Sequence, residues 1–260
     1  MSDYKPDLFH FAYFPEYETK LEFLAQIAEP EEWDFSDTSN KKYTILENYI
    51  KNTFNKLKSE QKIVYTKNNE YACFNTGLTT SLFEDIYALF TVNNNKMPEN
   101  SPYFFVGFFK ESDNNIIDKF SDKLPETANY FDKPEHLIFN PKYDIITQKE
   151  HIIQDNRERF PEHLKKNDEN HLLRIIEGAI SEVKKRVRRN YKLAVPQYYK
   201  GKIQLLLPLY LTDNSSNPDL ALAISLINNN TYTARTCLTL KMAYNNARLI
   251  VKPQSNWLKP

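Results

Sequence analysis

The feature that most constrains the fold of this 260-residue chain is a change of hydrophobic period in its second half. Before Pro196 apolar residues recur at helical spacing, and after it they recur at every second position. A period of two is typical of strands with one buried face. The sequence therefore predicts three consecutive antiparallel strands, over residues 203–211, 220–227 and 231–240. Strict alternation in the third run places Tyr232, Ala234 and Thr236 on one face, with Arg235 and Cys237 on the other.

Helical spacing is clearest in two stretches. Residues 41–61 carry an apolar stripe of Leu46, Ile50, Phe54 and Leu57. A longer helix begins at a cap formed by Asn167 or Asp168, and its basic last turn is favourable for the helix dipole. Its apolar stripe consists of Leu172, Ile176, Ala179, Ile180, Val183 and Val187.

The order of these elements predicts an α+β fold, with a mostly antiparallel sheet and helices packed on it. Residues 62–66 and 71–75 form a plausible hairpin, and residues 86–92 and 103–110 are further strands. We expect a compact single domain over residues 1–260. Its parts are a helical part at 1–61, a first strand-rich part at 62–143, and a third part at 144–260 with the basic helix, the three-strand meander and a C-terminal element.

The charge of the chain is concentrated in one segment. Residues 184–202 hold eight basic residues and no acidic one, although the whole chain is formally neutral. Residues 1–130 hold 13 basic and 21 acidic residues (13 − 21 = −8), and residues 131–260 hold 21 and 13 (21 − 13 = +8). Cations attract phosphates, and interleaved aromatic rings can stack on bases. The segment therefore predicts an RNA or nucleotide partner; the alternatives are a solvated helix end, or two halves of the molecule that attract each other.

The candidate nucleic-acid contacts extend from this helix into the loop expected after it. Asn and Gln amides can read base edges, Lys can contact phosphate, and Tyr can stack on a base. The alternative is a connecting loop whose polar groups satisfy one another. The candidate residues are Lys184, Lys185, Arg188, Arg189, Asn190, Lys192, Gln197, Tyr198, Lys200 and Lys202.

One spacing suggests catalysis. His151, Asp155 and Arg159 fall at i, i+4 and i+8, so a helix over residues 148–159 would place them on one side. A histidine and a carboxylate one turn apart can act as acid and base. The alternative is a surface ladder of ion pairs, which is commoner.

Two polar clusters are candidates for a ligand pocket. Asn75 and Thr76 precede Gly77 at the end of a strand, where a loop could hold a ligand or simply turn the chain. Asn245, Asn246 and Arg248 interrupt an otherwise apolar C-terminal element, and buried amides need partners. Each cluster either binds a ligand or stabilises the fold.

Several common sites are excluded by pattern. The chain has only four glycines and no Gly-x4-Gly-Lys-Ser/Thr, which argues against a P-loop. Cys73 and Cys237 are expected to be buried free thiols, and no Cys or His spacing fits zinc, so we predict no metal and name no cofactor. No apolar run is long enough for a membrane span, and no secretory signal is visible. We therefore expect a cytoplasmic, bacterial-type protein with no membrane partner.

Several strings of the sequence are characteristic in combination. They include Phe74-Asn75-Thr76-Gly77-Leu78, Arg188-Arg189-Asn190-Tyr191-Lys192, Ala194-Val195-Pro196-Gln197-Tyr198-Tyr199, Leu205-Leu206-Leu207-Pro208-Leu209 and Met242-Ala243-Tyr244-Asn245-Asn246-Ala247-Arg248. In these strings the chain resembles, over most of its length, the bacterial and fungal domain-of-unknown-function family numbered 3825. Members of that family are sometimes found with small RNA-binding modules, so the resemblance implies a link to RNA and assigns no catalytic residue.

Three functions stay open at this stage. The first is RNA or nucleotide binding through the basic, tyrosine-interleaved segment, in RNA metabolism or a bacterial defence context. The second is a phosphodiesterase-like or nuclease-like hydrolase that uses His151, Asp155 and Arg159. The third is a protein-interaction scaffold. The first function predicts binding that depends on salt. The second predicts turnover that requires His151, and the third predicts neither.

Overall fold

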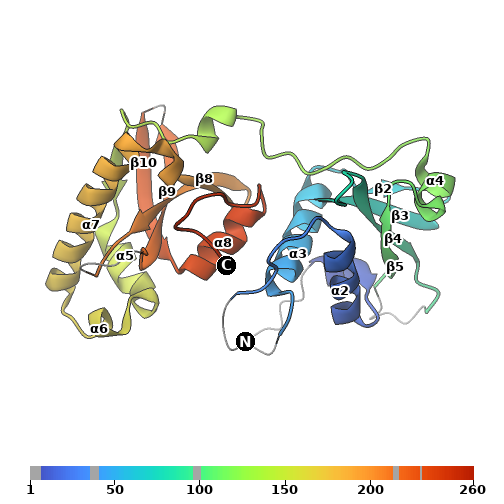
Figure 1. Cartoon of the computed structure of the whole chain (residues 1–260), viewed down its shortest axis with the longest axis horizontal. Coiled ribbons are helices and arrows are strands. Elements are labelled where there is room, and N and C mark those ends of the chain that lie inside the picture. Colours follow the sequence, from blue (N-terminus) through green and yellow to red (C-terminus); the bar gives the residue numbers. More distant parts are fainter. Residues whose placement is uncertain (1–6, 36–40, 96–100, 213–216, 229) are drawn as a thin grey trace. The chain divides into compact units, whose positions relative to one another are not determined.

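The structure is a computed structural model that describes residues 7–35, 41–95, 101–212, 217–228 and 230–260. The chain divides into two compact units, Met1–Asn129 (unit 1) and Tyr130–Pro260 (unit 2). Each unit contains one five-stranded sheet with helices packed on it (Figure 1). The α+β class is confirmed, and both sheets are mixed, because each adds one parallel pair to an antiparallel ladder. That the whole chain acts as a single domain stays a prediction.

The sheet of unit 1 has the order β1-β5-β4-β3-β2. The parallel pair is β1 with β5, and the other neighbours are antiparallel. The predicted hairpin at 62–75 and the two strands after it are confirmed. The strands are β1 (Ala12–Tyr13), β2 (Val64–Tyr65), β3 (Tyr71–Thr79), β4 (Asp85–Val92) and β5 (Tyr103–Lys110).

Helices cover both faces of this sheet because its side chains alternate. Phe74 packs its ring against Phe54 of α3, with ring centroids 5.6 Å apart. The preceding Cys73 faces the other way and packs with Ile116 and Phe120 of α4. All four stripe residues predicted for the helix at residues 41–61 are buried in α3. The helices are α1 (Asp7–Phe11), α2 (Tyr17–Ile27), α3 (Thr44–Ser59) and α4 (Asn114–Phe120).

The sheet of unit 2 has the order β6-β10-β9-β8-β7, in which only β6 and β10 are parallel. The three strands predicted from the period of two are confirmed as β8 (Lys202–Leu209), β9 (Leu220–Asn228) and β10 (Thr231–Leu238). Two strands were not predicted, β6 (Asp144–Thr147) and β7 (Val195–Tyr199).

The prediction of a loop after the basic helix is therefore wrong in part, because residues 195–199 form a strand. Pro196 has no N–H for a ladder, yet β7 tolerates it because it lies at the sheet edge and pairs only with β8. Lys200 and Gly201 turn the chain, with φ of 46° and 81°. Positive φ at both central residues matches the right-handed twist of a two-residue hairpin.

The face assignment of the third predicted strand is also wrong. A register shift between Ala234 and Thr236 marks a bulge, which adds one residue to the strand. Cys237 consequently shares the core with Tyr232 and Ala234 instead of facing away from them. The expectation of buried free thiols is confirmed for both cysteines.

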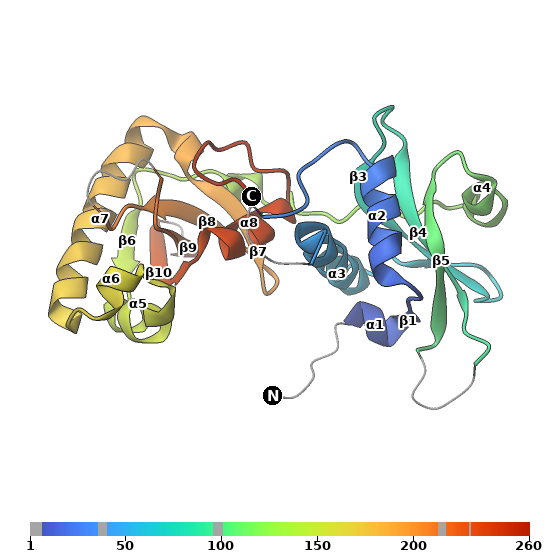
Figure 2. The same cartoon turned by 60° about the horizontal axis from the view of Figure 1, so that its bottom comes forward.

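Helices lie on both faces of the second sheet (Figures 1 and 2). The stripe of α7 packs against the odd-numbered leucines of β8, whereas α8 lies beside β7 on the opposite face. The remaining elements of unit 2 are η1 (Pro134–Leu137), α5 (Lys149–Asn156), η2 (Arg157–Arg159), α6 (Glu162–Lys165), α7 (Glu169–Arg189), η3 (Tyr191–Leu193) and α8 (Leu240–Arg248). No described helix combines the length and apolar character needed to cross a bilayer.

Candidate functional site

The basic segment begins inside α7, whose sequence explains its form. The Asp168 carboxylate accepts a hydrogen bond from the His171 N–H at 2.9 Å, so the predicted cap is confirmed. All six residues of the predicted stripe are buried. The inner face of α7 is thus fully used by the core, which leaves the cations of its last turns at the surface, with Arg188 and Arg189 exposed.

Some of these cations already have partners. Arg186 pairs with Glu182 at 2.5 Å, and its guanidinium lies 4.5 Å from the centre of the Tyr210 ring. Lys184 donates to the Ile145 carbonyl at 3.4 Å. The others make no ion pair with any residue that the structure describes: Lys185, Arg188, Arg189, Lys192, Lys200 and Lys202.

The segment does not form one continuous patch. β7 separates its two ends, and five residues at about 3.3 Å each extend over roughly 16 Å. One group, the α7-end cluster, consists of Lys184, Lys185, Arg188, Arg189 and Lys192. The other, the hairpin cluster, consists of Lys200 and Lys202. The two clusters therefore lie at opposite ends of β7.

A groove of about 570 Å³ lies beside the α7-end cluster. Residues 190 and 192–196 form one wall, and residues 251–256 of the C-terminal tail form the other. Trp257 anchors the tail, because its indole N–H donates to the Leu193 carbonyl at 3.0 Å. Lys192 and Lys252 contribute charge from opposite walls, and apolar side chains such as Val195 and Val251 line the space between. We call this feature the tail groove.

Of the predicted contact residues, Asn190 lines this groove and Tyr198 does not. Asn190 caps η3, since its side-chain oxygen accepts from the Lys192 N–H at 3.2 Å, while its amide nitrogen is not used in that contact. Tyr191 is 56% exposed, so most of its ring is open to a stacking partner. Tyr198 instead makes an edge-to-face contact with Tyr130, 5.0 Å between ring centroids.

Gln197 and Asn246, predicted in separate clusters, are brought together in a buried network. The Asn246 amide donates to Gln197 at 3.0 Å, and Gln197 donates to Gln204 at 2.8 Å. Gln204 in turn donates to Ser225 at 2.8 Å. Gln197 is only 1% exposed, so its amide joins β7, β8, β9 and α8 instead of facing solvent.

The other members of the predicted ligand pockets are also largely internal. Asn245 has a buried side-chain oxygen without a hydrogen-bond partner among the described residues, and Arg248 is buried. In unit 1, Asn75 donates to Asp85 at 2.8 Å and accepts from the Gly77 N–H. Thr76 donates to the Ile86 carbonyl at 2.6 Å. These contacts stabilise the irregular end of β3.

The predicted catalytic group is split by the structure. His151 and Asp155 meet on α5, with Nδ1 and Oδ2 2.8 Å apart, and both are exposed. The expectation that Arg159 shares their face is wrong, because α5 ends at Asn156 and the chain tightens into η2. The Arg159 guanidinium then points to β10, where it donates to the Cys237 carbonyl at 2.6 Å.

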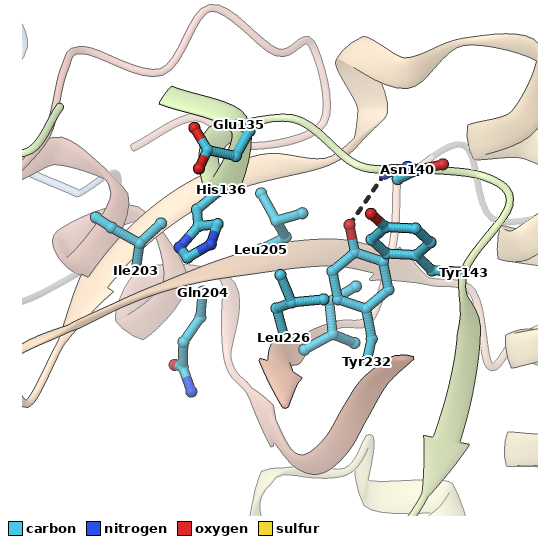
Figure 3. Close-up of a pocket in the computed structure, with 10 residues that line it drawn as sticks. Glu135, His136, Asn140, Tyr143, Ile203, Gln204, Leu205, Leu226 and Tyr232 are labelled. Atoms are coloured by element: carbon cyan, nitrogen blue, oxygen red, sulfur yellow. Dashed lines mark hydrogen bonds between the residues drawn. The ribbon is translucent and has the colours of Figure 1, made fainter. Parts of the chain in front are cut away.

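A second pocket in unit 2 was not anticipated from the sequence. It lies between η1, the segment that leads into β6, and the strands β8 to β10 (Figure 3). We call it the sheet pocket. Its polar lining residues are Glu135, His136, Asn140, Tyr143, Gln204 and Tyr232. They have no common spacing, so no local pattern in the sequence indicates the pocket.

The described residues offer little else for metal or thiol chemistry. Within the described ranges, no group of three or more His, Cys, Asp or Glu side chains could hold a metal ion. Burial raises the pKa of the Cys237 thiol to about 12, and burial also raises the pKa of Cys73. Neither thiol is therefore a ready nucleophile at neutral pH.

Comparison with known proteins identifies the family and no closer relative. No curated protein and no solved structure matches the chain significantly. One family model, described as a domain of unknown function (DUF3825), matches residues 24–257, which is most of the chain. The match extends across both units and includes the α7-end cluster and the tail groove. The chain therefore belongs to the DUF3825 family.

Proposed function

We propose that unit 2 binds single-stranded RNA, or the phosphates of a nucleotide, at the α7-end cluster and the adjoining tail groove. The observation that carries this proposal is that Arg188, Arg189 and Lys192 are exposed, close in sequence and without an acidic partner among the described residues. In unit 1, by contrast, Glu47 and Glu60 each pair with two lysines.

The chemistry of the cluster suits a phosphodiester. A guanidinium makes two parallel hydrogen bonds to phosphate oxygens, and its charge persists at any physiological pH. Tyr191 offers an exposed ring between Arg189 and Lys192, on which a base can stack. The volume of the tail groove, about 570 Å³, lies within the range of pockets that hold small ligands. A nucleotide could thus place phosphate at the helix end and its base or ribose between the apolar walls.

The test is a fluorescence-anisotropy titration of a labelled single-stranded RNA at several salt concentrations. Each phosphate contact should contribute roughly −0.7 to the slope of log affinity against log salt. Replacing both Arg188 and Arg189 with Gln should therefore flatten the slope by about 1.4. Replacing Tyr191 with Ala should weaken binding by about 1–3 kcal/mol with little change in slope.

The hairpin cluster supplies a matched control. Lys200→Gln with Lys202→Gln removes the same formal charge, two units, from the other end of β7. We expect this variant to retain a slope close to the wild type. No binding at low salt, or equal flattening by both double variants, would contradict the proposal and favour a solvated helix end or a long-range charge effect.

One contact keeps hydrolysis as a second candidate. The 2.8 Å contact between His151 and Asp155 is the arrangement in which a carboxylate orients a histidine for proton transfer. A fluorogenic RNA substrate tests it directly: His151→Ala should abolish turnover and leave the anisotropy titration unchanged. Undiminished turnover in that variant would show that His151 is not a catalytic residue. A chain that neither binds nor cleaves RNA would leave the scaffold alternative.

A further inference from the structure

The sheet pocket has the size of one six-membered ring. Its volume is about 120 Å³, and an engineered apolar cavity of about 150 Å³ in another protein holds benzene. Leu205, Ile224 and Leu226 of the sheet provide apolar contact surface. A two-ring purine would have to leave part of its area outside such a space.

Aromatic side chains form one side of this pocket. The rings of Tyr143 and Tyr232 have centroids 5.6 Å apart, and Phe139 stacks on Tyr232 at 5.3 Å with an interplanar angle of 17°. This stack fixes the position of the Tyr232 ring. Figure 3 shows Glu135 and His136 across the pocket from the two tyrosines. A flat ligand would therefore meet aromatic surface at one end and polar groups at the other.

The Tyr232 hydroxyl provides a donor that has no acceptor among the described residues. Its oxygen accepts the Asn140 N–H at 3.0 Å, drawn as the dashed line in Figure 3. A tyrosine hydroxyl is protonated at neutral pH, and burial raises the pKa of Tyr232 further. No described residue accepts that proton, although the residue is only 4% exposed. A buried donor without an acceptor costs free energy, which an oxygen atom of a ligand would recover.

We propose that the sheet pocket binds a single pyrimidine base, uracil or cytosine. The ring lies on the leucine surface beside Tyr143, and a ring carbonyl accepts the Tyr232 hydroxyl proton. The N3–H of uracil or the amino group of cytosine donates toward Glu135 or His136, which also line the pocket. The inference rests on the proposed function for the source of the base, a single strand held by unit 2, and it adds a preference among bases.

The test uses free nucleosides, because they carry no phosphate and cannot report on the α7-end cluster. Uridine, cytidine, adenosine and guanosine are titrated into the full chain by isothermal calorimetry or ligand-observed NMR. Uridine and cytidine should bind at least tenfold more tightly than the purine nucleosides. Their affinity should change little with salt, because no counterion is released.

Two variants localise the binding. Tyr232→Phe keeps the ring and removes the hydroxyl, so uridine affinity should fall by about tenfold, the equivalent of one hydrogen bond. Tyr210→Phe removes a hydroxyl at another place in unit 2 and should leave uridine affinity unchanged. Urea unfolding of both variants identifies any loss that is due to instability.

The outcomes separate this inference from the proposed function. Salt-dependent RNA binding without any nucleoside binding would overturn the pocket assignment and leave the α7-end site intact. Pyrimidine binding together with an unflattened slope in the double-Gln variant would support the pocket and contradict the α7-end site. Equal affinity for purine nucleosides, or full affinity in Tyr232→Phe, would overturn the inference even if the nucleosides bind.

Discussion

Arg159 should be a major local determinant of the stability of unit 2. Its Nη1 nitrogen lies 2.6 Å from the Cys237 carbonyl oxygen, 2.7 Å from Asn156 Oδ1 and 3.1 Å from Thr236 Oγ1. One guanidinium nitrogen carries two hydrogens, so about two of these three contacts count as full bonds. They join η2 and the end of α5 to β10.

The expected magnitude follows from those two bonds. A hydrogen bond to a charged donor contributes about 1.5–3 kcal/mol, and partial exposure of Arg159 favours the lower value for each. In Arg159→Ala the Asn156 oxygen keeps the Thr236 hydroxyl at 2.6 Å as a donor, whereas the Cys237 carbonyl loses the guanidinium. We therefore expect the free energy of unfolding to fall by about 2–3 kcal/mol.

The two tryptophans allow this loss to be measured in unit 2 alone. Trp33 lies in unit 1 and Trp257 in unit 2, and the chain has no other tryptophan. In a Trp33→Phe background, fluorescence during urea unfolding reports on Trp257. Asp155→Ala is the control, because its exposed pair with His151 should contribute less than about 0.5 kcal/mol. Equal losses in the two variants, or an Arg159→Ala change below about 0.5 kcal/mol, would refute the argument.

Three further predictions concern single positions. Gly178 lies inside α7, and a Cβ atom at this position would have no neighbouring atom within 4 Å, so Gly178→Ala should raise unfolding free energy by about 1 kcal/mol in the same urea assay. Gly77→Ala should lower it by about 1–3 kcal/mol, since φ is +73° and the new carbon would lie 2.7 Å from the Tyr49 hydroxyl. Burial tends to raise the pKa of Glu47, but hydrogen bonds from Lys41 and Lys51 outweigh it and lower the pKa. The contribution of Glu47 to the unfolding free energy of unit 1 is therefore complete above its ordinary pKa of 4.5, and it is lost as the pH falls through the lower pKa of the folded state. Glu47→Gln should therefore make the unfolding free energy of unit 1 depend less on pH in this acid range.

Local patterns were sufficient where one element determines its own structure. α7 could be predicted because Asp168 caps it and its apolar residues repeat at helical intervals. β7 could not, because it is short, contains Pro196 and ends in a Lys-Gly turn instead of the usual Asn-Gly. Such a strand forms mainly because it pairs with β8, and the periodicity of its own residues does not indicate that pairing.

Sites built from distant segments were harder to predict. The sheet pocket combines Glu135 with Tyr232, about a hundred positions later, and nothing in either local pattern indicates the other. The bulge in β10 adds to the difficulty, because it changes which residues share a face beyond Ala234. The cations of residues 184–202 were visible from composition, but their division between the two ends of β7 depends on that unpredicted strand.

The cations at the end of α7 could stabilise the helix or bind RNA, and the size of their effects on stability and on the salt slope separates these two roles. Cations in the last turn of a helix interact favourably with the helix dipole, which contributes about 0.3–1 kcal/mol each at an exposed position. Losing Arg188 and Arg189 should therefore lower stability modestly, while the apolar stripe, buried along the whole helix, keeps α7 folded. A purely structural role would show that small loss of stability and no change in the salt slope of RNA binding. A binding role would show both, and the hairpin variant, whose lysines lie outside any helix, would show neither.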